Sequence, residues 1–260
     1  MRSLFKGTSN ISLTLKICLT ALFVALDILA QKVFAINYLS FAPFLRISFA
    51  GPCIIIFASI FLGPIYGMLV GGLADLLGYV VFDPKAYPLF FQITLIYAVL
   101  GFSAYFVFRL VAFLKNKKVL LISMISFLSV LFLSVTLFLC LNNSLTLFST
   151  TYKIETYQKI VIPIILLVLF VGLALFIIFF DKKKQDDSSL LSPIQIGFAS
   201  LIIEVLIMVI FGSLMKAWAF GFKTYLIILI TQSMILFINV PLNTVFLTLL
   251  IKSVFPKYVK

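Results

Sequence analysis

Long apolar stretches alternate with short polar connections along the whole chain. A helix needs about 20 mostly apolar residues to cross the hydrocarbon core of a bilayer. The pattern predicts eight membrane-spanning helices, at about residues 11–36, 45–62, 64–82, 87–113, 119–142, 159–180, 192–215 and 223–253. The predicted fold class is therefore an all-α membrane protein.

Composition narrows the function classes further. Of the 260 residues, 63% are apolar and 11% are charged, against about 25% charged in an average soluble domain. This composition excludes a water-soluble enzyme, a disordered regulator and a secreted disulfide scaffold. The chain has no His, and Cys18, Cys53 and Cys140 lie in apolar stretches without a CxxC pair. We expect no metal site, no cofactor and no catalytic residues.

The net charge of +12 indicates membrane topology rather than nucleic-acid binding. The basic residues stand singly between apolar stretches and form no nucleic-acid-reading motif. If the N-terminus is inside, the inner segments hold 13 of the 20 Lys and Arg residues, at 2–16, 109–118, 182–184 and 252–260. Positive residues favour the cytoplasmic side, so both termini are expected there. Arg is rare beside Lys, and Phe and Ile are abundant, which indicates an AT-rich bacterial genome. The predicted location is the bacterial plasma membrane.

Two short polar segments, 115–118 and 181–192, divide the chain. They predict an N-terminal half of the bundle over residues 1–114, with four spans. An inserted pair of transmembrane helices follows over 115–190. The C-terminal half of the bundle, with the last two spans, covers 191–260.

Small residues recur at helical spacing in the third predicted span. Gly-Pro breaks the apolar stretch there, and Gly residues follow at intervals of four and seven; these helix-packing candidates are Gly63, Pro64, Gly67, Gly71 and Gly78. Small residues at this spacing let two helix backbones approach closely in lipid. The alanine pair Ala21 and Ala25 forms a similar face on the first span.

Three carboxylates, Asp27, Asp75 and Glu204, lie inside predicted spans. An ionisable group in a span is expensive and should face protein or a wet cavity. Each one either makes a structural hydrogen bond to a neighbouring helix or belongs to a proton relay.

Cationic and aromatic residues gather in the predicted outer loops. If these loops converge, they form an outward pocket suited to a flat anionic molecule, with the candidates Arg46, Tyr87, Lys216, Trp218 and Lys223. Arg provides a bidentate carboxylate clamp, and aromatic rings provide stacking faces. The alternative is interfacial anchoring, because the same residue types favour membrane–water boundaries.

The chain resembles the substrate-binding S components of energy-coupling factor (ECF) vitamin transporters, most closely the folate-type branch. The resemblance rests on Arg46-Ile47-Ser48-Phe49, Pro52, the series from Gly63 to Gly78, and Tyr87-Pro88. It implies a six-helix bundle, here with two added transmembrane helices, and an extracellular pocket for folate or a related anionic aromatic vitamin. The implied ligand-binding residues are Arg46, Ser48, Asp75, Tyr87, Lys216, Trp218 and Lys223.

The resemblance also implies partners and the absence of enzymatic activity. An S component works with a transmembrane T subunit and two cytoplasmic ATPases, and Ala21 and Ala25 would face the T subunit. The chain has no P-loop sequence, so any ATP-driven uptake requires another polypeptide. The competing hypotheses are a stand-alone proton-coupled transporter that uses the intramembrane carboxylates and a membrane-embedded enzyme or assembly factor.

Overall fold

The structure is a computed structural model, which describes residues 12–33, 35–36, 47–48, 51–82, 90–147, 150–182, 191–221 and 225–258. Within these residues, seven helices are long and apolar enough to cross a membrane: Leu13–Gln31, Pro64–Phe82, Phe91–Phe113, Lys117–Leu141, Thr156–Asp181, Pro193–Ala219 and Tyr225–Val254. The prediction of an all-α membrane protein agrees with this architecture at the level of fold class.

The elements follow one another in a simple order. The first half contains α1 (Leu13–Ile28), the π-helix η1 (Leu29–Val33), β1 (Ala35–Ile36), β2 (Ile47–Ser48), α2 (Gly51–Leu62), α3 (Pro64–Phe82) and α4 (Phe91–Phe113). The second half contains α5 (Lys117–Leu141), β3 (Ser144–Leu147), β4 (Thr150–Lys153), α6 (Thr156–Lys182), α7 (Pro193–Ile203), the π-helix η2 (Glu204–Phe211), α8 (Gly212–Phe220) and α9 (Tyr225–Tyr258).

The second predicted span is shorter than the sequence suggested. The apolar stretch 45–62 predicted a transmembrane helix, but α2 has only 12 residues, about 18 Å of helix. That length does not cross an apolar layer of about 30 Å. Eleven of its residues are buried by protein. The prediction of eight spans is therefore corrected to seven long helices and one short buried helix within the described residues.

A tight turn joins α2 to α3. Gly63 has φ +106°, a conformation that glycine adopts without a Cβ penalty, and Pro64 begins α3. The two helices run antiparallel and pack on each other, so α2 covers only the first 12 or so residues of the 19-residue α3. Gly51, at the start of α2, therefore lies part-way along the bundle, near the level of Asp75.

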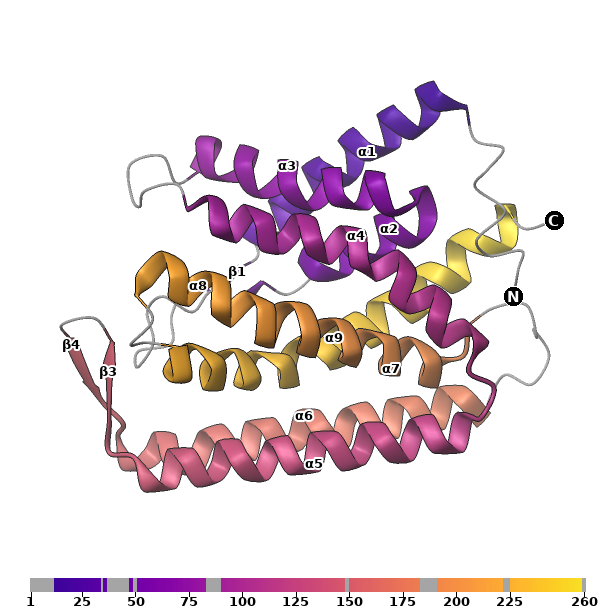
Figure 1. Cartoon of the computed structure of the whole chain (residues 1–260). Coiled ribbons are helices and arrows are strands. Elements are labelled where there is room, and N and C mark those ends of the chain that lie inside the picture. The colour runs from indigo at the N-terminus through magenta and orange to yellow at the C-terminus, as the bar shows by residue number, and fades with distance from the viewer. Residues whose placement is uncertain are drawn as a thin grey trace.

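The helices form two packed groups that share a central pair (Figure 1). One core contains side chains from α1, α2, α3, α4, α7 and α9, and the second contains side chains from α5, α6, α7, η2 and α9. The α5–α6 hairpin lies along α7 and α9 on the side away from α1 and α3. The polar segments at 115–118 and 181–192 fall at the connections that lead into and out of this hairpin.

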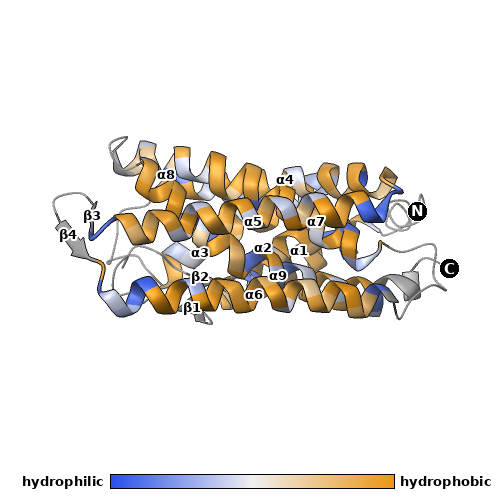
Figure 2. Cartoon of the chain, turned by 90° about the horizontal axis from the view of Figure 1, so that it is seen from below, coloured by the Kyte–Doolittle hydropathy of each residue, from blue (hydrophilic) through white to orange (hydrophobic). Residues whose placement is uncertain are grey.

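The bundle has two distinct ends. At the Leu114 end, α1 begins, α4 ends and α9 ends; at the Asn143 end, α3 ends, α5 ends and α9 begins (Figure 1). In Figure 2, the lengths of α5 and α6 are coloured mainly as hydrophobic, and hydrophilic residues gather near their ends. This distribution is that of helices which cross an apolar layer.

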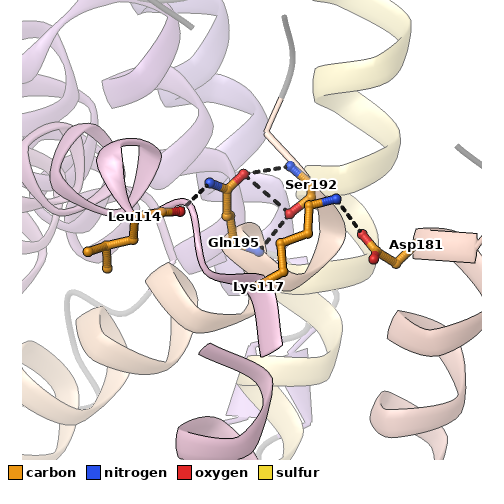
Figure 3. Close-up of polar contacts among 5 residues, drawn as sticks. All are labelled: Leu114, Lys117, Asp181, Ser192 and Gln195. Atoms are coloured by element: carbon orange, nitrogen blue, oxygen red, sulfur yellow. Dashed lines mark hydrogen bonds and ion pairs between the residues drawn. The ribbon is translucent and has the colours of Figure 1, made fainter. Parts of the chain in front are cut away.

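Polar contacts fasten the α5–α6 hairpin at the Leu114 end (Figure 3). Gln195 Nε2 donates to the Leu114 carbonyl oxygen at 3.0 Å, which ties α7 to the end of α4. Ser192 and Gln195 form a capping box at the start of α7. Lys117 Nζ pairs with Asp181 Oδ1 at 3.2 Å, linking α5 to α6.

Helices α3 and α4 cross at glycines. A Cβ placed on Gly71 would lie 2.2 Å from the Tyr97 carbonyl oxygen, and one on Gly101 would lie 2.0 Å from the Gly67 carbonyl oxygen. A Cβ on Gly67 would lie 2.5 Å from Ser59 Cβ on α2. The backbones approach this closely because no side chain separates them. Gly78 is also buried on α3.

Candidate functional site

A buried polar cluster, here called the Asp27 cluster, is made of Asp27, Gln31, Cys53, Asp75 and Thr94. Asp27 is 0% exposed although it lies in a membrane-spanning helix. Gln31 Nε2 donates to its Oδ2 at 2.7 Å. Asp27 Oδ1 is buried and has no hydrogen-bond partner in the described part of the chain. One of the two carboxyl oxygens therefore lacks the hydrogen-bond partner that a buried polar atom normally has.

The other members of the Asp27 cluster come from three further helices. Asp75 on α3 is half-buried and accepts a hydrogen bond from Thr94 Oγ1 on α4 at 2.5 Å. Asp27 interacts electrostatically with Asp75 and with the buried Cys53 on α2. Helices α1, α2, α3 and α4 thus contribute polar side chains to one place, toward the Asn143 end.

Non-helical backbone lies beside this cluster. β1 and β2 pair antiparallel, with Ala35 opposite Ser48, and both strands contact η1. They precede α2, which begins only part-way along α3, so the chain enters the bundle here before it becomes helical. Irregular backbone at membrane depth is tolerated where protein buries it or where it lines a cavity. β1 and β2 are therefore expected either to be shielded by protein or to line a cavity.

A second buried group, the Glu204 cluster, is made of Glu204, Lys216, Asn239 and Asn243. Glu204 is 1% exposed and begins the π-helix η2. Asn243 Nδ2 donates to its Oε1 at 2.8 Å, and Asn239 Nδ2 donates to its Oε2 at 3.3 Å. The two asparagines are four residues apart and share one face of α9. Because both carboxylate oxygens accept amide donors, the arrangement suits an ionised Glu204.

Lys216 provides positive charge for this carboxylate. Its ammonium group interacts electrostatically with Glu204 across the turns of η2 and α8. A buried charge in a span also needs hydrogen bonds to its polar atoms, and the asparagine pair supplies them for Glu204. The site therefore combines a fixed anion with a cation nearer the Asn143 end.

Several predicted ligand-binding residues are not covered by the structure. Arg46, Tyr87 and Lys223 lie outside the described residues. The backbone of Ser48 forms part of β2, but its side chain lies outside the described part.

Lys216 and Trp218 do not share a face of α8. Residues two apart on a helix point to different sides. Lys216 is half-buried and interacts with Glu204, whereas Trp218 is 58% exposed. This position of Trp218 agrees with the alternative of interfacial anchoring.

Ala21 and Ala25 lie on the outer face of α1. Both residues are exposed, while Thr20, Val24 and Asp27 on the other face are buried. The first helix therefore presents small residues outward and a carboxyl group inward.

Sequence reasoning found the three carboxylates but not their partners. Asn239 and Asn243 carry a detectable signal, because two amides four residues apart in an apolar span indicate a polar helix face. Thr94 and Cys53 carry no comparable signal, because single residues of these types are common in apolar helices. Among the described residues, no group of three or more Cys, Asp or Glu is placed to hold a metal ion.

These features define the class of protein: a multi-pass α-helical membrane protein with two buried polar clusters. Comparison with known protein families, with curated proteins and with solved structures found no match to this chain.

Proposed function

We propose that the chain is the substrate-binding S subunit of an ECF-type importer, which captures a vitamin at the outer face of a bacterial plasma membrane. In this proposal both termini are cytoplasmic, so the Asn143 end is the outer end. The ligand is folate or a related anionic aromatic compound. The chain binds this ligand without catalysis, and partner subunits supply the ATP.

The helix arrangement supports the proposal. When the α5–α6 hairpin is set aside, the described bundle consists of α1, α2, α3, α4, the α7–α8 segment and α9. This is the number of core helices that the resemblance implies. The hairpin contacts mainly α7 and α9, so it lies beside the bundle and leaves the Asp27 cluster uncovered by α5 and α6.

The observation that carries the proposal is the placement of Lys216. It lies near the Asn143 end and is half-buried, and its charge interacts with that of Glu204. β2, which contains Ser48, contacts η1 and precedes α2. In this proposal Arg46 and Lys216 bind the ligand carboxylate together, because two cations from different parts of the chain suit such a group.

The outward face of α1 supports a partner surface. Small exposed residues at a spacing of four allow another helix to pack closely in lipid. Ala21 and Ala25 provide that spacing on a face that the bundle leaves uncovered. We propose this face as the contact with the T subunit, which in turn contacts the two ATPases.

Ligand binding to the purified chain tests the proposal. Folate is titrated into the full chain in detergent and followed by calorimetry, with Lys216→Gln and Arg46→Ala as test variants. Each variant is expected to lose about 1.5–3 kcal/mol, the usual worth of a charge-assisted bond, which is about 10- to 150-fold in Kd. Lys118→Gln removes the same charge at the Leu114 end and should bind as the native chain does. The proposal fails if a folded chain binds neither folate nor any other anionic vitamin.

A proton-coupled carrier is the second candidate, favoured by the incompletely paired Asp27 carboxyl group. Such a carrier would transport its substrate in liposomes without partners when a pH gradient is applied. An S subunit alone would only bind. Uptake by the isolated chain therefore separates the two candidates.

A further inference from the structure

We propose that Asp27 is a proton-binding site, with the proton on Oδ1. This inference does not depend on the vitamin or on the partner subunits. It concerns the state of one carboxyl group inside the bundle.

Asp27 is buried where an ionised carboxylate would be unfavourable. The side chain is 0% exposed in a helix long enough to cross the membrane. An ionised carboxylate in such a place needs a cation or hydrogen-bond donors for both oxygens. Gln31 Nε2 donates a hydrogen bond to Oδ2 at 2.7 Å, and no group in the described part of the chain donates to Oδ1. A proton on Oδ1 removes the charge and leaves Oδ2 as the acceptor that Gln31 requires.

The neighbouring titratable groups favour the same state. Asp75 on α3 and Cys53 on α2 are the groups whose charges interact with Asp27. Asp75 adds like charge, which disfavours a second ionised carboxylate nearby. Cys53 is a buried thiol and provides no positive charge. Lys32 and Lys16 are the nearest cations in the sequence. The side chain of Lys32 lies outside the described part, and Lys16 Nζ lies over the Tyr66 ring, 5.8 Å from its centroid.

The packing around Asp27 admits a proton at Oδ1 but no larger ligand. Because Asp27 is fully covered, a larger ligand does not reach Oδ1 in this structure. A bound metal ion would need several oxygen ligands, and the described residues contain no group of three acidic or thiol side chains placed for one. Protonation needs neither a cavity nor further ligands.

Glu204 provides an internal comparison. It is as deeply buried as Asp27, but each of its oxygens accepts an amide donor and Lys216 supplies positive charge. The geometry thus gives Asp27 a stronger need for a proton than Glu204, because both oxygens of Glu204 have donors. Loss of the Asp27 proton would leave an unpaired charge between α1, α2 and α3, so it would favour a state in which Oδ1 gains water or another partner.

Infrared spectroscopy of the full chain at neutral pH tests the proposal. A protonated carboxyl group has a carbonyl stretching band that an ionised carboxylate lacks, and the band shifts in D₂O. The folded native chain should show this band, and Asp27→Asn should lose it. Glu204→Gln and Asp181→Asn should retain the Asp27 band, because neither substitution removes the Asp27 proton. Asp181 is a half-buried residue paired with Lys117 at the Leu114 end.

The remaining outcomes also decide the proposal. Absence of the band in the folded native chain overturns it. Retention of the band in Asp27→Asn, or its loss in Asp75→Asn alone, also overturns it, since the proton would then lie elsewhere. If Asp27→Asn does not fold, Asp27→Glu is used in its place. A changed band frequency then supports the site, and an unchanged frequency contradicts it.

Discussion

Replacing Gly71 with alanine tests the reasoning about the α3–α4 crossing. The new Cβ would lie 2.2 Å from the Tyr97 carbonyl oxygen and 2.7 Å from its carbon. Ordinary contacts of a Cβ begin near 3.4 Å. The obstructing atoms belong to the backbone of α4, so a rotamer change does not relieve the contact. The helices must separate by roughly 1 Å, because neither backbone yields locally.

The magnitude follows from two opposing terms. Alanine favours helix over glycine by about 0.8–1 kcal/mol. Overpacking a close-packed site destabilises by about 1–3 kcal/mol, and separation weakens contacts along the whole crossing. The neighbouring Gly72→Ala has the same propensity term, but its Cβ meets only Ala98 Cβ at 3.6 Å. Gly71→Ala should therefore be less stable than Gly72→Ala by about 1–3 kcal/mol.

Unfolding of the purified chain in mixed micelles, titrated with SDS and followed by circular dichroism, measures this difference. Gly172→Ala on α6 is a second control, because no atom lies within 4 Å of its added Cβ. Both controls should match or exceed the native stability. Equal stability of Gly71→Ala and Gly72→Ala would refute the view that the missing side chain at Gly71 allows the helices to meet.

Three further predictions concern the polar contacts and the orientation. Asn243→Ala should lower the free energy of unfolding by about 1–3 kcal/mol, because a buried carboxylate oxygen loses its donor; an SDS titration measures this, and a loss below about 0.5 kcal/mol would contradict it. Gln195→Ala should lower stability in the same assay by about 1 kcal/mol, more than Asp181→Asn, whose partly exposed ion pair contributes little. In a cysteine-free background, an impermeant maleimide should label Ser144→Cys on intact cells but label Lys118→Cys only after permeabilisation; the reverse pattern would place the Asn143 end in the cytoplasm.

The sequence predicted the long helices well because lipid imposes a simple pattern. The predicted span 64–82 coincides with α3, and the ends of the other long helices agree within a few residues. The exception, 45–62, shows the limit of this argument. An apolar stretch has the same sequence pattern whether lipid or protein surrounds it. The sequence therefore did not reveal that α2 is short and buried inside the bundle.

The candidate site was harder to predict because its contacts join distant parts of the chain. Glu204 meets Asn243 only when η2 and α9 pack together, and Asp75 meets Thr94 only across the α3–α4 crossing. Spacing within one helix does not predict such pairs. The small-residue series did indicate a packing face, but its partner, Gly101 on α4, became evident only from the structure.

The two buried acids differ in how firmly they tie their helices to the bundle. Glu204 joins η2 to α9 through both of its oxygens, and α7 and α9 lie between the two packed groups. Movement there would break a complete hydrogen-bond set and disturb both cores. Asp27 has one partner, and that partner lies in its own helix. Within the described part of the chain, no hydrogen bond ties this carboxyl group to α2 or α3, and the far face of α1 is exposed. The buried acid of α1 thus ties its helix to its neighbours less firmly than Glu204 ties η2 to α9.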